Sequence, residues 1–159
     1  MASSSPVQPV YVDPLRDIFL PLQHSFDSLL TGRSLTLTLE VDKPGRLLWA
    51  DGFLLLEACT LLLEYGTAHA SEGSRMTVQV AEIGIFDEIV IRVEGTRLSD
   101  REIDVIFSPG DRPALSNSQA ALHRAYLLIE KLGGKLWADR GSEHWITFTV
   151  KLPKRRGSC

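Results

Sequence analysis

Few residues of this 159-residue chain have the types and spacing that chemistry requires. The four histidines, His24, His69, His123 and His144, are scattered and form no HExxH-like pair. No neighbouring cysteines and histidines show the spacing of a zinc site, so we expect no metal. The sequence also contains no phosphate-binding P-loop, no Ser-His-Asp set and no paired-carboxylate signature. These common classes of enzyme are therefore not indicated.

The two cysteines do not predict a disulfide framework. Cys59 lies within an apolar helical pattern, and Cys159 is the last residue. We therefore expect a reducing, cytoplasmic location. No run of about 18 apolar residues occurs, so no membrane insertion of this chain is expected.

Charge and composition indicate one globular domain with no general attraction to nucleic acid. A net charge of −3 gives no general attraction to nucleic acid, so no nucleic-acid partner is expected. Residues 1–9 are small, polar and proline-bearing and are predicted to be a disordered leader. Residues 154–159 form a basic C-terminal tail, interpreted as solvated. The domain is then expected to span residues 10–153.

The first expected element is a helix that ends at Gly32. Apolar residues recur at spacings of three and four from Leu15 to Leu30. Asp13 is suited to cap this helix and Pro14 to occupy its first turn, while Pro21 is a potential kink.

A strand and a central helix follow. Residues 34–42 alternate apolar and polar side chains, which predicts a strand with one wet face. A short apolar piece, residues 47–49, precedes Asp51, which is suited to cap a helix over residues 52–70. That helix is apolar nearly all round and is therefore expected to be central.

The second half predicts two hairpins separated by helices. Two alternating segments meet at Gly84, and Ser99 can cap a short helix after them. A loop of turn-forming residues, 108–118, leads into a helix that stops at Gly133, and a closing hairpin ends the chain. This order predicts an α+β fold, a two-layer sandwich in which helices pack on one face of a mixed, mostly antiparallel sheet.

These features in this order resemble the catalytic, ATP-binding domain of sensor histidine kinases, a GHKL domain with the Bergerat fold. The resemblance covers roughly residues 10–153. "LLWADGFLLLEACTLLLEYGTAHASEGSRMTVQV" is similar to the helix and strand that carry the family's asparagine box. "IVIRVEGTRL" stands at the first glycine box, and "DVIFSP" at the phenylalanine box. "AALHRAYLLIEKLGGKLWADRGSEHWITFTVKLP" resembles the last helix and final hairpin.

The resemblance implies that the chemistry of the asparagine box is missing. The family's asparagine helps to hold the magnesium ion that bridges the nucleotide phosphates, and Tyr65 stands in its place. The polar or acidic residue one turn earlier is replaced by Leu61. Glu64, next to the key position, is a weak candidate for a metal or cofactor contact, but its carboxylate is expected to point to another part of the helix.

The resemblance further implies erosion of both glycine boxes. The aspartate that reads the adenine amino group is replaced by Val93, and the second glycine by Arg97. Gly95 matches one glycine, and a shifted frame would make Glu94 the adenine reader, so both remain weak candidates. Residues 116–125 contain no glycine where the family's backbone approaches phosphate, and Ser116 or Ser118 is expected to cap the helix instead.

We therefore expect a degenerate histidine-kinase-like ATPase domain, with no catalytic residue and no cofactor, that acts in signal transduction by binding proteins. Its partners would be kinases or response regulators. The expected interaction surface comprises His69, Arg97, Ser116 and Asn117, with the tryptophans of the last hairpin as a second candidate. The alternative is a divergent but active catalytic domain that binds ATP with magnesium. His24 lies on a helix, faintly like a phosphoacceptor, but is interpreted as a surface residue.

Overall fold

The computed structural model describes residues 6–95, 98–109, 115–141 and 144–155. Its main element is a five-stranded sheet in the order β2-β4-β5-β7-β6. The strands are β2 (Thr36–Val41), β4 (Arg75–Ile83), β5 (Phe86–Glu94), β6 (Lys135–Arg140) and β7 (Trp145–Pro153). Only β2 and β4 run parallel, whereas the other neighbours are antiparallel. The sheet is therefore mixed and mostly antiparallel, as predicted.

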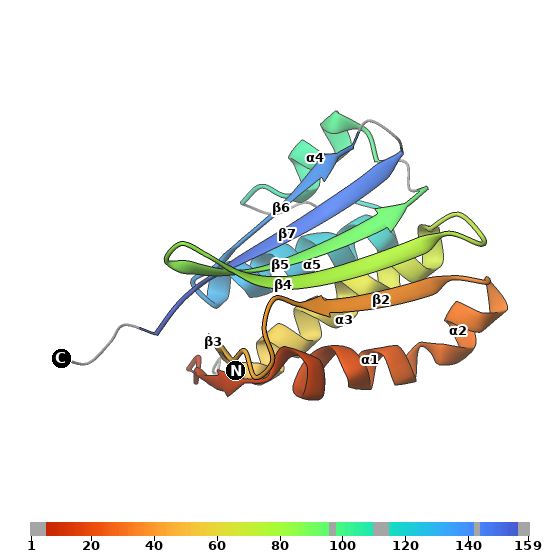
Figure 1. The fold of residues 1–159 in the computed structure, drawn as a ribbon. Coiled ribbons are helices and arrows are strands. Elements are labelled where there is room, and N and C mark those ends of the chain that lie inside the picture. Colours follow the sequence, from red (N-terminus) through yellow and green to blue (C-terminus); the bar gives the residue numbers. More distant parts are fainter. Residues whose placement is uncertain (1–5, 96–97, 110–114, 142–143, 156–159) are drawn as a thin grey trace.

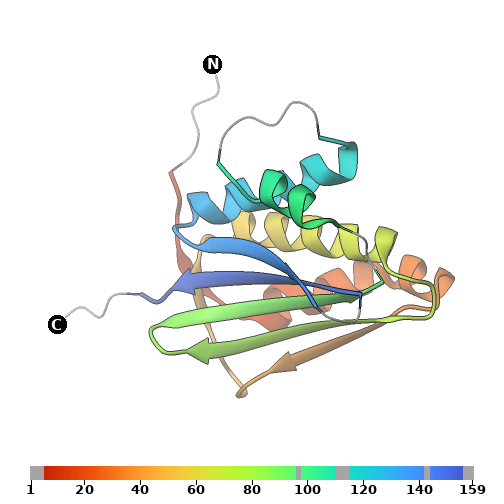
Figure 2. The ribbon, with the colours of Figure 1, turned by 90° about the horizontal axis from the view of Figure 1, so that it is seen from above.

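Helices cover one face of this sheet (Figures 1 and 2). They are α3 (Gly52–His69), α4 (Asp100–Ile106) and α5 (Asn117–Lys131). Alternate strand residues point toward them, so that Ile89, Ile91 and Val93 of β5 are fully buried. This arrangement confirms the predicted two-layer α+β sandwich. The caps predicted at Asp51 and Ser99 are also confirmed, because their side chains accept backbone hydrogen bonds from the first helical turns.

The N-terminal helix predicted as one element is divided into three, which corrects that prediction. A π-helical turn, η1 (Pro14–Phe19), is followed by α1 (Leu20–Ser25) and α2 (Asp27–Gly32). Asp13 caps the first turn as expected, accepting from the N–H groups of Leu15 and Arg16 at 3.0 Å. Pro21 has no N–H to donate to the preceding turn, and it lies in the first turn of α1, just after the π turn ends at Phe19.

Two short strands were not predicted as strands. β1 (Val10–Val12) pairs antiparallel with β3 (Leu48–Ala50), and the rings of Tyr11 and Trp49 meet edge to face at 4.9 Å. The guanidinium carbon of Arg155 lies 4.9 Å from the Trp49 ring centre. Three residues are too few for alternation to indicate a strand. β1 begins at Val10 and β7 ends at Pro153, the limits proposed for the domain, whereas residues 1–5 and 156–159 lie outside the described parts.

The edge strand β2 is bordered by the N-terminal helices (Figure 1). The Gln23 side chain of α1 donates a hydrogen bond to the backbone carbonyl of Leu37 at 3.1 Å. The Leu37 carbonyl lies on the outer edge of β2, where no neighbouring strand of the described residues donates a hydrogen bond to it, and the Gln23 side chain supplies one instead. An unprotected strand edge is a template for aggregation, so this contact and the adjoining helices protect β2.

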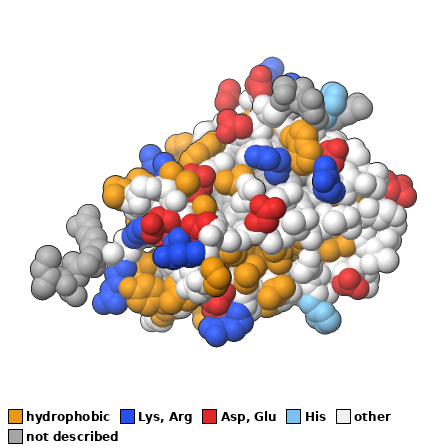
Figure 3. All heavy atoms as spheres, viewed as in Figure 1, with side chains coloured by type: hydrophobic (Ala, Val, Ile, Leu, Met, Phe, Trp, Pro, Cys, Tyr) orange, Lys and Arg blue, Asp and Glu red, His pale blue; other side chains and the backbone are white. Residues whose placement is uncertain are grey.

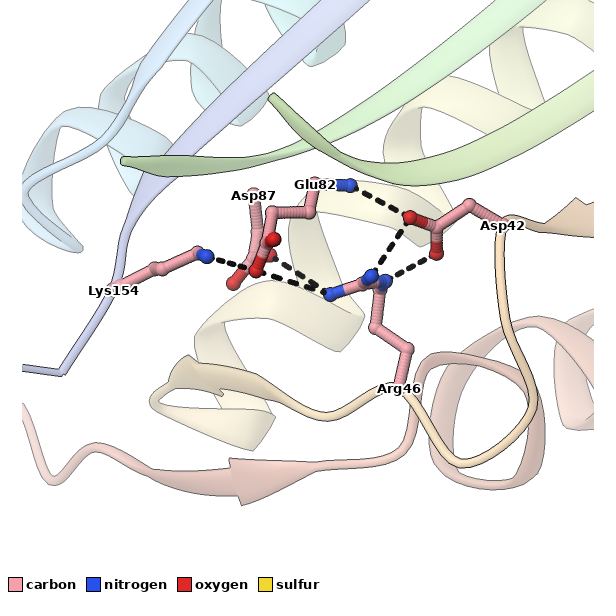
Figure 4. A network of polar contacts seen from close by, with 5 residues as sticks. All are labelled: Asp42, Arg46, Glu82, Asp87 and Lys154. Carbon is pink, nitrogen blue, oxygen red and sulfur yellow. Dashed lines mark hydrogen bonds and ion pairs between the residues drawn. The ribbon is translucent and has the colours of Figure 1, made fainter. Parts of the chain in front are cut away.

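A network of charged side chains joins three segments at one end of the sheet (Figure 4). Arg46, only 8% exposed, forms a two-pronged ion pair with Asp42, with 2.7 Å between Nη2 and Oδ2. Its Nη1 lies 3.6 Å from Asp87 Oδ1 and 3.7 Å from Glu82 Oε2. Lys154, after β7, pairs with Glu82. The network therefore joins the β2–β3 connection, the β4–β5 hairpin and the end of β7.

Arg46 is the centre of this network because it faces three carboxylates. The hydrogen bond from its guanidinium lowers the pKa of Asp42 to about 2. Burial raises the pKa of Asp87, whose Oδ1 accepts no hydrogen bond from the described residues. Without the Arg46 charge, the buried Asp87 carboxylate would lack its nearest cation, which is costly in a low-dielectric environment.

We expect Arg46→Met to lower the free energy of unfolding by about 2 to 4 kcal/mol, because it removes one of the two cations, Arg46 and Lys154, that act on the buried Asp87 carboxylate. Urea denaturation monitored by circular dichroism measures this change. Arg16→Met is the matched control, since Arg16 belongs to an exposed pair and should change stability by less than about 0.5 kcal/mol. Equal effects of the two substitutions would contradict the role assigned to Arg46.

Candidate functional site

The segments singled out by the sequence converge on the helical side of the sheet. They are the second half of α3, the end of β5, α4 and the start of α5. Six rings lie between these elements and β7: Tyr65, His69, Phe107, His123, Tyr126 and Phe148. We call these six residues the aromatic cluster. It occupies the region in which the resemblance places the nucleotide-contacting boxes.

Tyr65 enters this cluster as a core side chain. It is 6% exposed, and its ring centre lies 5.9 Å from that of Phe148, edge to face. On the other side it stacks on the exposed His69 ring at 4.5 Å. Edge-to-face and stacked aromatic pairs contribute about 0.5 to 1.5 kcal/mol beyond their buried area. The side chain at the asparagine-box position therefore packs against other rings.

The other half of the cluster joins α4 to α5. Phe107 lies 6.4 Å from Tyr126 and 6.0 Å from Phe148 between ring centres. The buried His123 ring stacks on Tyr126, and its Nδ1 lies 2.7 Å from the Ile106 carbonyl oxygen at the end of α4. Burial, together with the nearby Glu130 carboxylate, raises the pKa of Tyr126. Sequence reasoning did not identify this cluster, because aromatic residues at helical spacing indicate only a core.

Glu64 lies on another side of α3 from Tyr65, whereas Leu61 lies on the same side, one turn earlier. Glu64 is exposed although the adjacent Tyr65 is buried, because successive helical side chains are about 100° apart. The carboxylate therefore points away from the aromatic cluster, in the direction expected from the sequence. Leu61, one turn before Tyr65, is partly buried and packs against the core.

Val93 and Glu94 face opposite sides of the sheet. Val93 is fully buried on the helical side, where it contacts the core. Glu94 alternates with it onto the other face, and its carboxylate accepts a 3.2 Å hydrogen bond from the backbone N–H of Arg75. This bond fastens the end of β5 to the start of β4.

Gly95 is required by packing at this point. Its φ is +89°, and a Cβ added to it would lie 1.8 Å from Ser71 Oγ and 2.8 Å from the Ser71 backbone nitrogen. Its N–H donates to the His144 carbonyl oxygen at 2.8 Å. The turn after α3 and the turn after β5 are therefore in close contact, which accounts for a glycine without a ligand.

Ser116 caps α5, as expected from the sequence. Its Oγ accepts from the Gln119 N–H at 3.3 Å, and the Gln119 side chain accepts from the Ser116 N–H. The Gln119 side chain also donates a hydrogen bond to the Glu102 carboxylate at 2.6 Å. Glu102 and Ser99 form the capping box at the start of α4. The two capping boxes are thereby joined, which holds α4 against α5.

The expected interaction surface is only partly described. His69 and Asn117 are exposed, whereas Arg97 lies outside the described residues. Trp137 and Trp145, the second candidate surface, are each partly buried, and His24 is exposed on α1. A residue that sequence reasoning missed is Arg33, whose guanidinium donates to the carbonyl oxygens of Thr67 and Ala70 at the end of α3. It thereby satisfies orphan carbonyls and complements the negative end of the helix.

Within the described residues, histidine, cysteine, aspartate and glutamate side chains form no group of three or more that could hold a metal ion. Cys59 is fully buried, and burial raises the pKa of its thiol to about 12. It is therefore an unreactive core residue. In the part of the chain that the structure describes, no helix has the length and apolar character to cross a membrane.

Comparison with known proteins identifies the fold. Many solved structures match this chain, including three that match almost its whole length. The nucleotide-free catalytic domain of histidine kinase ThkA is 16% identical, with 92% of this chain and 97% of that chain covered and a TM-score of 0.80. The mycobacterial sensor histidine kinase MprB is 19% identical, with 95% and 99% covered and a TM-score of 0.70. ThkA in complex with the response regulator protein TrrA is 17% identical, with 94% and 44% covered and a TM-score of 0.73.

No protein-family model and no curated protein matches the sequence. The similarity to known proteins therefore rests on the solved structures. The chain has the fold of histidine kinase catalytic, ATP-binding domains, and the predicted fold resemblance is confirmed.

We expect Gly95→Ala to lower the free energy of unfolding by about 3 kcal/mol or more, because the added Cβ meets Ser71 at a left-handed backbone position. Gly84→Ala is the matched control. Gly84 also has a positive φ, of +62°, but nothing lies within 4 Å of its added Cβ, so a loss of about 1 kcal/mol is expected. Thermal unfolding of both variants checks the difference, and equal losses would refute the close contact.

Proposed function

We propose that this domain is a degenerate histidine-kinase-like domain that acts in cytoplasmic signal transduction by binding other proteins and does not use ATP. The observation that carries the proposal is the environment of Tyr65. At the position of the family's magnesium-binding asparagine, a phenol ring is buried against Phe148 and stacked on His69. A neutral phenol is a poor substitute for the carboxylate and carbonyl oxygens that magnesium prefers, and the His69 imidazole offers only nitrogen.

The position of the adenine-reading aspartate supports the same proposal. Val93 there is fully buried and offers no hydrogen-bond acceptor. The alternative reader, Glu94, is already bonded to the Arg75 N–H on the opposite face of the sheet. A carboxylate at position 93 would be buried in the core, which is costly for a charge without a partner.

The start of α5 also supports a role without phosphate. Phosphate binding at a helix N-terminus requires backbone N–H groups that can approach the ligand closely. Here the Gln119 N–H is bonded to Ser116 Oγ, and side chains replace the family's glycines in residues 116–125. The helix start is satisfied by its own capping box.

We propose that the function of this domain is to bind a partner protein. One structurally similar protein, ThkA, forms a complex with a response regulator. We propose that this chain likewise contacts kinases or response regulators, through a surface that includes His69, Ser116, Asn117 and Arg97. Loops and helix ends on a rigid scaffold are common binding surfaces.

The alternative is a divergent catalytic domain that binds ATP with magnesium through Glu64 or Glu94. Calorimetric titration with a non-hydrolysable ATP analogue and magnesium separates the two proposals. We expect no saturable heat at micromolar concentrations, because the positions that bind magnesium and adenine carry apolar or aromatic groups. Micromolar binding that Glu64→Gln or Glu94→Gln weakens would refute the degenerate domain and favour the alternative.

Binding of a partner is tested with a panel of purified receiver domains of response regulators. We expect at least one to bind with micromolar affinity, measured by biolayer interferometry, whether or not ATP is present. Asn117→Arg should weaken that binding at least tenfold, because it places a long cation at the start of α5. Ile85→Arg, an equally large change at an exposed residue of the β4–β5 turn, is the control and should have no effect. A panel without any binder would count against response regulators as partners.

A further inference from the structure

A hollow of about 350 Å³ lies at the other end of α3 from the aromatic cluster. It is bounded by β1, by η1 and by the first turn of α3, and we call it the N-terminal hollow. Phe53 and Tyr65 are twelve residues apart, so roughly 18 Å of helix separates it from the aromatic cluster. It is therefore distinct from the surface proposed above.

The apolar side chains that line the N-terminal hollow are unusually exposed. Phe53 is 87% exposed, Tyr11 53% and Val10 51%. Single exposed apolar residues are common on protein surfaces, but several around one hollow mark a binding site. α3 is apolar nearly all round, and such a helix is usually covered on every side. In its first turn Phe53 is uncovered, although Leu55 is fully buried.

The hollow continues along α3 as a groove. A second, shallower depression shares Phe53 and Leu56 with the N-terminal hollow and extends past Glu57 to Thr60. The two depressions together follow the first turns of the helix. Such an elongated apolar channel fits an extended or helical chain segment better than a compact small molecule.

The charges at the rim have one sign. Asp17 and Asp51 line the hollow, and no lysine, arginine or histidine is among the described lining residues. The Asp13 N–H lowers the pKa of Asp17. Burial raises the pKa of Asp51, but hydrogen bonds from the Gln8, Leu54 and Phe53 N–H groups outweigh it, so this pKa also lies below its ordinary value. Both carboxylates are therefore ionised at neutral pH.

Among the nearby cations, Lys131 lowers the pKa of Asp51 and the Arg155 guanidinium carbon lies 5.8 Å from the Tyr11 ring centre, so Asp17 is the more available carboxylate of the rim. Arg16 contacts Asp17 at 3.3 Å, but its side chain is 78% exposed, and such surface pairs contribute little and exchange readily. Arg124 is bonded to Glu57 at 2.8 Å, away from Asp17 and Asp51. An incoming cation can therefore pair with the Asp17 carboxylate, which is 40% exposed.

The charge also argues against a second copy of this chain as the occupant. In a two-fold dimer the same patch meets itself. Asp17 and Asp51 of one copy would then lie near those of the other, and like charges across an interface disfavour association. The complementary occupant is apolar and basic.

We propose that the N-terminal hollow and its groove bind a segment of a partner protein that inserts an apolar side chain beside Phe53 and pairs a neighbouring lysine or arginine with Asp17 and Asp51. The proposal does not depend on whether the domain binds nucleotide. It assigns a second interaction surface, opposite in position to the one at the end of α3.

A phage-displayed library of random twelve-residue peptides tests this directly. The library is selected on the wild-type domain after depletion on the Phe53→Ala variant, which should stay folded because Phe53 is exposed. We expect enrichment of peptides with an aromatic or aliphatic residue within three positions of a lysine or arginine. Failure to enrich any peptide, or enrichment of acidic peptides, would overturn the proposal.

The selected peptide is then measured by fluorescence anisotropy. Binding should weaken at least tenfold in Phe53→Ala and Val10→Ser and about threefold in Asp17→Asn, and it should weaken with added salt. Ile85→Ala, at a residue 75% exposed on the β4–β5 turn, is the control and should leave affinity unchanged. Unchanged affinity in Phe53→Ala, or a concentration-dependent dimer that Phe53→Ala abolishes, would refute a basic peptide segment as the occupant.

Discussion

The packing of α3 against the sheet and beside α5 is the contact on which the rest of this molecule depends. Leu55, Leu62 and Leu63 are fully buried, and the helix lies within the crossover between the two parallel strands β2 and β4. Its ends are fixed by Asp51 at the start and Arg33 at the finish. Because both ends of α3 are fixed, the helix sets the position of the two proposed surfaces. The N-terminal hollow lies at its start, and the surface that includes His69 lies at its end.

The aromatic cluster fills the space between the end of α3, α4, α5 and β7 with packed rings. A side chain that binds magnesium needs an oxygen that faces a hydrated cavity. Such a cavity lacks the close packing that is typical of a protein interior. Rings at Tyr65, Phe107 and Phe148 contribute contact area instead. The same scaffold therefore favours stability at the position where the structurally similar kinases would place polar ligands.

Local signals in the sequence predicted the sheet, the helices and several caps. The alternation in β5 and the caps at Asp51 and Ser116 involve residues that are close together in the chain. Such local signals can be read from a single sequence. The charge network of Arg46 and Asp87 could not be predicted, since its members lie far apart in the chain and meet only after folding. The aromatic cluster was missed for the same reason, and β1 and β3 were too short to give a periodic signal.

In space-filling form, charged side chains are scattered over the open face of the sheet among white atoms of the backbone and other side chains (Figure 3). Hydrophobic side chains gather instead along the lower edge, over the N-terminal segment. The connections between paired strands also differ in length across the sheet. β4 with β5 and β6 with β7 are hairpins of neighbouring residues, whereas β2 pairs only with β4 across the whole α3 crossover. Such pairing carries a larger loop-closure cost, so we expect β2 and its bordering helices to open more readily in amide hydrogen exchange than the two hairpins.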